Sequence, residues 1–424
     1  MLGVRRGSAG GVVVALGVAS FTGCYLSHER PGDGGAPAVD QAPPALGEVD
    51  EGFVDVLPRC DEPAVLRAEP ARMLLEGGLG AQQLLELEDG WLVLAWVNLS
   101  GRYEAWLQRL ARDGSPQGEP VILTDDVEAS IDFPRLAFDG DGLILAWTED
   151  HARIRLRRVE VDGSVGPIHE VALPPEVPRR GLIVWQVAPD DRGIHLLVNP
   201  GFGDPTFAIL VDRDGTLLAG PAHTRRVPTE EGRYARGPSR WSPDGPVEWA
   251  EYRQPGPWQL WTGELSYDDG VTAPELVAEV EWGLQVGASL VPPRPVLIVR
   301  DPFDSTRFHE RAPRGLGPEL LELRHDEGDP GPMARFQDCG VGMLAERGEL
   351  RPTNPLGTFL DVRLYDRDFA LLAGPVQLDR NDPGTYIERA EIAWNGRSFG
   401  VLYTETRTTN RLLFFRRVRV GRRG

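Results

Sequence analysis

The fold is decided by residues 133–173, FPRLAFDGDGLILAWTEDHARIRLRRVEVDGSVGPIHEVAL. This stretch reads as four short strands separated by tight turns, with Asp139–Gly142 (DGDG) in the first turn and Asp162–Gly163 in the third. Asp-Gly between alternating apolar runs predicts a hairpin, because the central turn residues need positive φ. The stretch therefore predicts one four-stranded antiparallel unit.

Imperfect copies of this unit recur along the chain at a spacing of roughly 50 residues, within the range typical of repeat folds. Trp96 and Trp147 occupy the same place in two copies of LAW, and Asp113-Gly114 matches Asp162-Gly163 at the third turn. Asn395-Gly396 marks the first turn of the last copy. Because the apolar alternation has period two and Gly or Pro interrupts it regularly, the copies are not helical.

Seven such copies predict an all-β protein, a seven-bladed β-propeller of four-stranded antiparallel blades. The last copy stops after its third strand, at Val420, whereas Glu69–Leu75, upstream of the first copy, has the pattern of a fourth strand. The resemblance to the propeller superfamily implies that this N-terminal strand completes the last blade. Such pairing removes the open sheet edge that a linear array would leave.

The N-terminus carries an export signal. Arg5 and Arg6 precede an apolar run, Gly10–Phe21, which is too short to span a bilayer and matches a secretory signal peptide. Phe21-Thr22-Gly23-Cys24 resembles the lipobox of bacterial lipoproteins, although Leu is usual in place of Phe21. This resemblance implies a signal peptide over residues 1–23 and lipidation of Cys24. An ordinary signal peptide that ends in a Cys is the alternative.

We therefore expect an exported protein of a Gram-negative cell envelope, lipid-anchored in the outer membrane rather than the inner one, because Tyr25 follows the Cys. Residues 24–64 are rich in Pro, Gly and Ala and predict a flexible tether to the propeller at 65–424. The net charge of −19, with all 45 basic residues being Arg, disfavours nucleic acid and anionic lipid headgroups. We expect a monomer that contacts the membrane only through its anchor.

Two further cysteines, Cys60 and Cys339, are available in an exported protein, where disulfides persist. In a propeller the outer strand enters from the face that carries the turns between first and second strands. Cys339 lies in such a turn of the sixth copy, next to the blade that the N-terminal strand completes. The propeller resemblance thus implies a Cys60–Cys339 disulfide. Two free thiols are the alternative.

No catalytic residue is predicted from motifs. The seven His lack metal-ligand spacing, and neither a Gly-x-Ser-x-Gly elbow nor a phosphate-binding loop with Lys is present. We read Asp139-Gly-Asp141-Gly as a hairpin turn, because it lacks the other ligands of a calcium loop. His195 alternates with apolar neighbours and Trp261 repeats the position of Trp106, so we expect structural roles for both.

The loops between second and third strands open on the face where propellers usually bind ligands. Candidate binding residues in these rim loops are Glu149, Asp150, His151, Asp301, Asp304, Glu346, Arg351, Glu405 and Arg407. A ring of carboxylates can bind Ca²⁺ or supply an acid/base pair for glycan chemistry, and solvated loop ends explain the same residues. No cofactor or metal is predicted, with Ca²⁺ as the alternative.

Over residues 69–424 the chain resembles exported bacterial lipoproteins that carry a single seven-bladed β-propeller. The blade pattern specifies the fold but not an activity. The resemblance favours a non-catalytic binding scaffold for a protein or glycan that uses the rim loops. The alternative is a polysaccharide hydrolase or lyase that uses rim carboxylates.

Overall fold

The computed structural model describes residues 53–60, 62–99, 101–140, 142–200, 206–224, 233–240, 246–253, 257–280, 284–285, 296–300, 305–311, 316–324, 329–338, 340–347, 359–380, 385–407 and 410–424. The elements assigned along these residues are β-strands, and in that part of the chain no helix is long and apolar enough to cross a membrane. The signal peptide, the lipobox with Cys24 and most of the tether lie outside the described residues.

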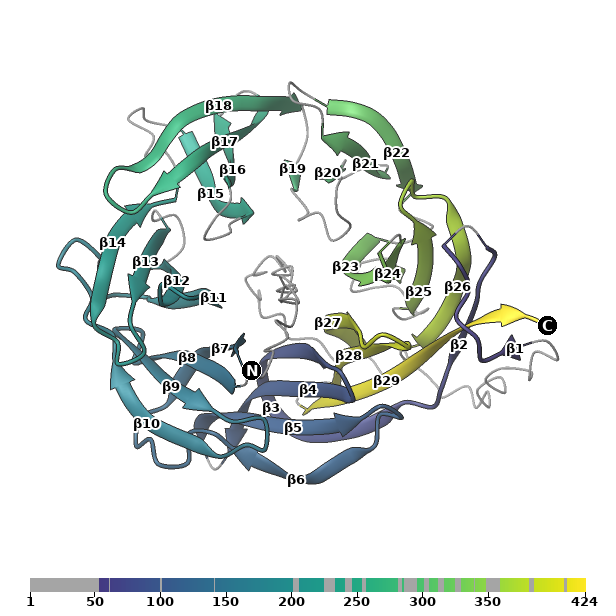
Figure 1. Cartoon of the computed structure of the whole chain (residues 1–424), viewed down its shortest axis with the longest axis horizontal. Coiled ribbons are helices and arrows are strands. Elements are labelled where there is room, and N and C mark those ends of the chain that lie inside the picture. Colours follow the sequence, from purple (N-terminus) through teal and green to yellow (C-terminus); the bar gives the residue numbers. More distant parts are fainter. Residues whose placement is uncertain are drawn as a thin grey trace, which may run out of the picture.

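Seven four-stranded antiparallel sheets stand in a ring, with the first strand of each sheet innermost (Figure 1). This arrangement confirms the predicted seven-bladed propeller. Blades two to six contain β7(Ile131–Asp139) to β10(Val165–Glu170), β11(Ile183–Pro189) to β14(Leu217–His223), β15(Arg233–Arg240) to β18(Gly270–Val280), β19(Leu284–Gln285) to β22(Leu316–Arg324) and β23(Asp329–Phe336) to β26(Leu371–Arg380). Their middle strands are β8(Gly142–Glu149), β9(Arg153–Val159), β12(Ile194–Asn199), β13(Phe207–Val211), β16(Pro246–Arg253), β17(Trp258–Ser266), β20(Val296–Arg300), β21(Ser305–Arg311), β24(Gly340–Arg347) and β25(Phe359–Asp366).

Blades one and seven share a strand, β3(Arg72–Leu87). Its first half pairs with β29(Asn410–Arg423), so that Leu75 lies opposite Leu413 and Met73 opposite Phe414. Its second half pairs with β4(Gly90–Leu99), which continues into β5(Arg102–Ala111) and β6(Pro116–Ile122) of blade one. The chain therefore passes from the outer position of blade seven to the inner position of blade one without a break.

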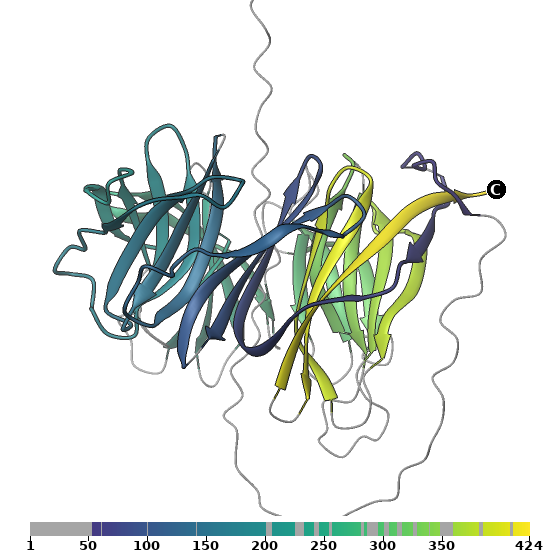
Figure 2. The ribbon, with the colours of Figure 1, turned by 90° about the horizontal axis from the view of Figure 1, so that it is seen from below.

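The remaining strands of blade seven are β27(Thr385–Trp394) and β28(Ser398–Arg407). Beyond the pairing with β3, the long strand β29 also pairs with β2(Val65–Ala68) and with β1(Phe53–Val54) (Figure 2). The predicted closure of the last blade by the N-terminal segment is thus observed. The paired segment starts at residue 53, inside the range assigned to the tether.

Side chains hold the seam between blades seven and one. Gln82 on β3 is buried and donates from Nε2 to the carbonyl of Leu402 on β28 at 3.2 Å, while the Thr404 hydroxyl donates to Gln82 Oε1. The rings of Trp91 and Phe415 pack with their centroids 5.0 Å apart. Gly400 leaves room for both rings, because a Cβ there would lie 2.7 Å from Trp91 Nε1 and 2.8 Å from Phe415.

A register shift recurs in the innermost strand of six blades. It falls between Leu79 and Gln82 in β3, Asp132 and Arg135 in β7, and Val184 and Gln186 in β11. Equivalent shifts occur in β15, β23 and β27. A β-bulge bends its strand and redirects a side chain. The bulge is therefore part of the repeated blade framework, and the residue that occupies it differs from blade to blade.

The segment before β2 lies against the turn between β23 and β24. Gln337 in that turn donates from Nε2 to the carbonyl of Pro58 at 3.3 Å, and Cys60 Sγ lies 3.6 Å from Gln337 Oε1. Leu57 and Ala64 pack against the core cluster between blades six and seven. These contacts place Cys60 beside the turn that carries residue 339, as the proposed disulfide requires. Cys339 itself lies outside the described residues.

We predict that Cys60 and Cys339 form a disulfide that fastens the N-terminal segment to blade six. Peptide mapping of the unreduced protein by mass spectrometry should recover a peptide that joins the two cysteines. Cys60→Ser should lower the free energy of unfolding by about 2–5 kcal/mol, because the cross-link restricts the unfolded chain. Free thiols at both positions in the purified, unreduced protein would contradict the prediction.

Candidate functional site

The structure brings three predicted rim residues together in the β8–β9 turn of blade two. Glu149 ends β8, Asp150 and His151 follow it with φ of 52° and 50°, and Arg153 begins β9. Glu346 and Glu405 lie near the ends of β24 and β28, in blades six and seven. Asp301, Asp304, Arg351 and the side chain of Arg407 lie outside the described residues. Among the predicted rim residues, those at the β8–β9 turn of blade two therefore define the candidate site.

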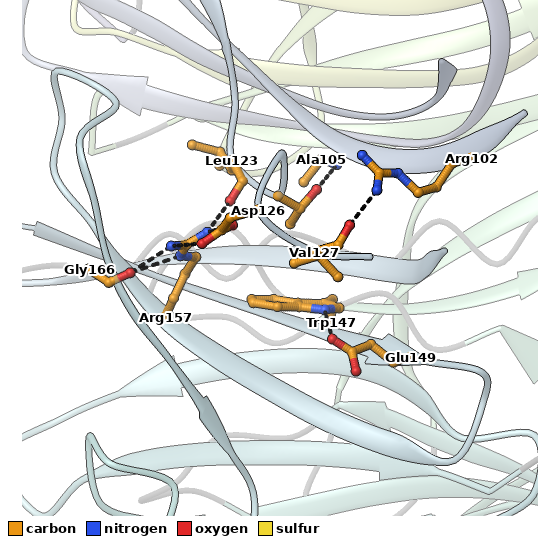
Figure 3. Close-up of polar contacts among 10 residues, drawn as sticks. Arg102, Ala105, Leu123, Asp126, Val127, Trp147, Glu149, Arg157 and Gly166 are labelled. Atoms are coloured by element: carbon orange, nitrogen blue, oxygen red, sulfur yellow. Dashed lines mark hydrogen bonds and ion pairs between the residues drawn. The ribbon is translucent and has the colours of Figure 1, made fainter. Parts of the chain in front are cut away.

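Glu149 contacts Trp147 (Figure 3) and two arginines of the same blade. Its side chain is 6% exposed, and Arg155 Nε donates to its Oε2 at 3.0 Å. Arg153 Nη2 lies 3.3 Å from the same oxygen, and Trp147 Nε1 donates to Oε1 at 3.4 Å. Both carboxylate oxygens are thus engaged within the blade. This arrangement makes Glu149 a structural acceptor and leaves it poorly placed as a general acid or base.

The position of Glu149, near the end of the second strand of its blade, carries Glu in other blades. Trp249 Nε1 donates to Glu251 Oε1 at 2.8 Å in blade four, which repeats the Trp147–Glu149 pair. Glu405 follows Tyr403 at the same spacing in blade seven, and Glu346 follows Leu344 in blade six. Glu149, Glu251 and Glu405 are each 5% exposed. Glu149, Glu346 and Glu405, predicted as rim binding residues, therefore belong to the blade repeat.

The loop from blade one to blade two is fixed by a buried arginine (Figure 3). Arg157 on β9 donates to Asp126 through two nitrogens, at 2.8 and 3.1 Å, and to the carbonyls of Leu123 and Gly166. The hydrogen bond from Arg157 lowers the pKa of the Asp126 carboxyl. Arg102 donates to the carbonyl of Val127 at 2.5 Å. The rim between the two blades is therefore a rigid support.

On this support, four rings from three strands and one turn form a continuous run. Trp96 on β4 lies between Tyr103 on β5 and Phe133 on β7, with centroid separations of 4.7 and 5.2 Å. The His151 ring follows, 6.4 Å from Phe133. Trp96 Nε1 donates to the carbonyl of Ile131 at 2.7 Å, which fixes the indole. We call Tyr103, Trp96, Phe133 and His151 the aromatic run.

The aromatic run is partly open to solvent and lies next to a carboxylate. The Tyr103, Trp96 and Phe133 residues are half-buried, whereas the His151 side chain is 52% exposed. Asp132 Oδ2 lies 3.4 Å from His151 Nδ1, with the Asp132 side chain 14% exposed. Burial raises the pKa of Asp132, the neighbouring Asp150 carboxylate raises it further, and His151 opposes the shift.

The backbone of this region is strained. Phe133 has φ of 49° and sits in the bulge of β7, and Asp150 and His151 also have positive φ. Positive φ is uncommon for residues other than Gly and is a true outlier for a bulky side chain. Such strain concentrates at functional sites, where the surrounding structure holds it in place. Here the strained residues include Phe133 and His151 of the aromatic run.

Sequence reasoning identified Asp150 and His151 but missed Tyr103, Trp96, Phe133 and Asp132. The missed rings come from two blades, and Phe133 reaches the rim through the bulge, which the alternation of the strand does not reveal. A signal was available: Phe133 lies near the start of the first strand of the blade-two copy and Trp96 near the end of the second strand of the blade-one copy, and these strand ends meet at the same rim. Among the described residues, no group of three or more His, Cys, Asp or Glu is arranged to hold a metal ion.

Three other predictions from the sequence agree with the structure. Asp139 pairs with Gly142 across the first turn of blade two, as expected for a hairpin. His195 is fully buried, with Nε2 2.9 Å from Asp190 Oδ2. Trp261 packs against the core cluster around Trp249.

No known protein family model matches the chain, and no curated protein is similar in sequence. Several solved structures are similar to the chain at low sequence identity. A puromycin hydrolase mutant is 17% identical, with 78% of this chain covered and a TM-score of 0.48. Raptor from Chaetomium thermophilum is 10% identical, with 80% covered and a TM-score of 0.43. Trypanosoma rangeli sialidase in complex with sialic acid is 11% identical, with 88% covered and a TM-score of 0.40. The chain spans 52%, 28% and 59% of the lengths of these proteins, respectively.

The innermost strands also carry charges that the sequence analysis did not single out. Glu391 stands three residues before Trp394 on β27, and Arg135 stands three residues before Phe138 on β7. Arg135 donates from Nε to the carbonyl of Trp185 at 3.1 Å, which links blades two and three. Burial raises the pKa of Glu391 to about 7, although Arg135 and Arg389 oppose the shift. Glu391 is therefore a destabilising charge at neutral pH.

This shift predicts a pH dependence of stability. Because the pKa of Glu391 is about 7 when folded and 4.5 ordinarily, the unfolded chain ionises first, and stability falls as pH rises from 4.5 through 7. The ionisation of Glu391 lowers the free energy of unfolding by at most about 3 kcal/mol over this pH range. In urea unfolding, Glu391→Gln should gain stability over the wild type as pH rises through this window. The exposed Glu275→Gln should show no such gain, and an identical pH profile for Glu391→Gln and the wild type would contradict the shift.

Proposed function

We propose that the protein is a non-catalytic binding module that holds its ligand at the rim of blades one and two. The observation that carries this proposal is the aromatic run, in which the rings pack on one another, the Trp96 indole is held by its hydrogen bond to the Ile131 carbonyl, and the residues remain partly exposed. Rigid, partly exposed aromatic side chains contribute most of the affinity at many binding surfaces. The rim therefore offers a prepared surface rather than a loose loop cluster.

The local chemistry favours binding over hydrolysis. A glycoside hydrolase needs two carboxyl groups free to act on the two sides of the scissile bond. Glu149 is fully engaged by Trp147, Arg153 and Arg155. Asp132 is paired with His151 beside the rings. Glu149 and Asp132 accordingly give no support to the hydrolase or lyase alternative.

We further propose that this module works at the cell envelope, where lipidated Cys24 anchors it and the segment before residue 53 spaces it from the membrane. The lipobox-like residues Phe21–Cys24 support this proposal. Mass spectrometry of the protein expressed with its own leader in a Gram-negative host should show cleavage before Cys24 and acyl chains on it. Cys24→Ser should release the protein from the membrane fraction, and an unmodified Cys24 in the mature protein would contradict the proposal.

The binding proposal predicts a localised effect of mutation. The wild type should bind a saturable ligand on a glycan or peptide array, and Phe133→Ala should weaken that binding at least tenfold, because the run loses one of its two internal rings. Tyr386→Ala removes a 50% exposed aromatic of blade seven and should bind like the wild type. Equal binding by the two variants, or no saturable ligand for the wild type, would contradict the proposed site.

A further inference from the structure

We infer that prolines in bulges of the outer strands keep the disc from pairing edge to edge with a second copy of the chain. Among the strands that the structure describes, the outer strands of blades one to six pair on one side only, each with the third strand of its own blade. These strands are β6, β10, β14, β18, β22 and β26, and they lie on the circumference of the ring (Figure 1). The unpaired N–H and C=O groups of such an edge are a template for another strand.

Apolar side chains are exposed on these outer strands. They include Val165, Leu218, Leu276, Leu316 and Leu371. An exposed apolar edge strand is a site of aggregation, and natural sheets often guard their edges with charged side chains, Lys above all. The chain contains no Lys. The outer strands therefore need a different guard against pairing.

A proline stands in a register shift of each of these six strands. In β18 the two residues Ala273 and Pro274 lie opposite the single residue Gly263 of β17, and the register shifts there. In β10 Gly166 and Pro167 form the corresponding insertion. The equivalent prolines of the other outer strands are Pro120, Pro221, Pro318 and Pro375.

Blade seven repeats the pattern with residues from the start of the chain. The pairing with β29 stops at Ala68 of β2 and resumes at Arg72 of β3, and Pro70 lies in this interruption. Six of the seven prolines are exposed, and Pro221 is half-buried. A proline that recurs at the outer bulge of every blade and faces solvent points to a role on the outside of the disc.

Proline and bulge act together on the edge. Proline has no N–H and cannot donate a ladder hydrogen bond, and a bulge bends the strand and disrupts the ladder. A strand of a second molecule can then pair with a few residues beside the bulge but cannot continue across it. The effect matters most for β18, which at 11 residues is the longest of the six strands. The circumference is thereby closed to strand addition, whereas the two faces of the disc stay open to partners.

The inference is tested by analytical ultracentrifugation of the full-length protein over a range of concentrations. Pro274→Val should form dimers or larger assemblies at concentrations where the wild type is a monomer, because Val supplies an N–H and favours an extended strand. Pro318→Val makes the same change in β22, a second edge that keeps the test valid if the first variant does not fold. Pro175→Val removes an exposed proline from the connection between β10 and β11 and should stay monomeric.

Pro274→Lys separates the opening of the edge from a general loss of stability. It restores the N–H as Val does, but its charge opposes strand pairing, so it should stay monomeric. In assemblies of Pro274→Val, the amides of β18 should exchange more slowly than in the monomer. A Pro274→Val or Pro318→Val variant that folds and stays monomeric, equal association of the Val and Lys variants, or protection away from the outer strands would overturn the inference. Association of the wild type through its outer strands would overturn it as well.

Discussion

Every other feature of the molecule depends on the backbone pairing between β29 and residues from the start of the chain. Without β3, β2 and β1 beside it, β29 would be the open edge of a seventh sheet, and open edges are sites of aggregation. The pairing also explains why β3 is the longest strand of the described chain, since it serves two blades in turn. The buried Gln82 and the contact of Trp91 with Phe415 over Gly400 then hold those blades together.

The framework and the candidate site differ in how far their features recur from blade to blade. Features that recur in several blades support the ring, whereas most features of the candidate site occur only once. The Trp-x-Glu pair recurs in blades two and four, and the innermost bulge recurs in six blades. By contrast, Phe133 with positive φ, Tyr103 beside Trp96 and the Asp132–His151 pair break the repeat. Glu149 and Glu251, which recur at one position of blades two and four, are thus explained by their hydrogen bonds inside the blade.

The sequence predicted the fold well because its determinants are local. Asp-Gly and Asn-Gly turns fix where strands end, and period-two alternation fixes which residues face the core. The closure was predictable because the incomplete last copy and the extra strand before the first copy complement each other. The aromatic run was not predictable, since its rings come from two blades and a bulge redirects Phe133. Phe53 and Val54 lie in the range predicted as a tether from its spacer-like composition, and they pair with Arg423 and Arg422 at the end of β29.

The central claim is that β29 is an inner strand with neighbours on both sides. Amide hydrogen exchange of the full-length protein, resolved to single residues over 410–423, tests it most directly. In an edge strand, alternate amides face solvent and exchange quickly, whereas a strand paired on both sides protects both sets. The account predicts slow exchange of consecutive amides at 411–415 and again at 418–419, where β29 pairs with β28 on one side and with β3 or β2 on the other. Fast exchange of every second amide through these two segments would contradict the closure of the ring.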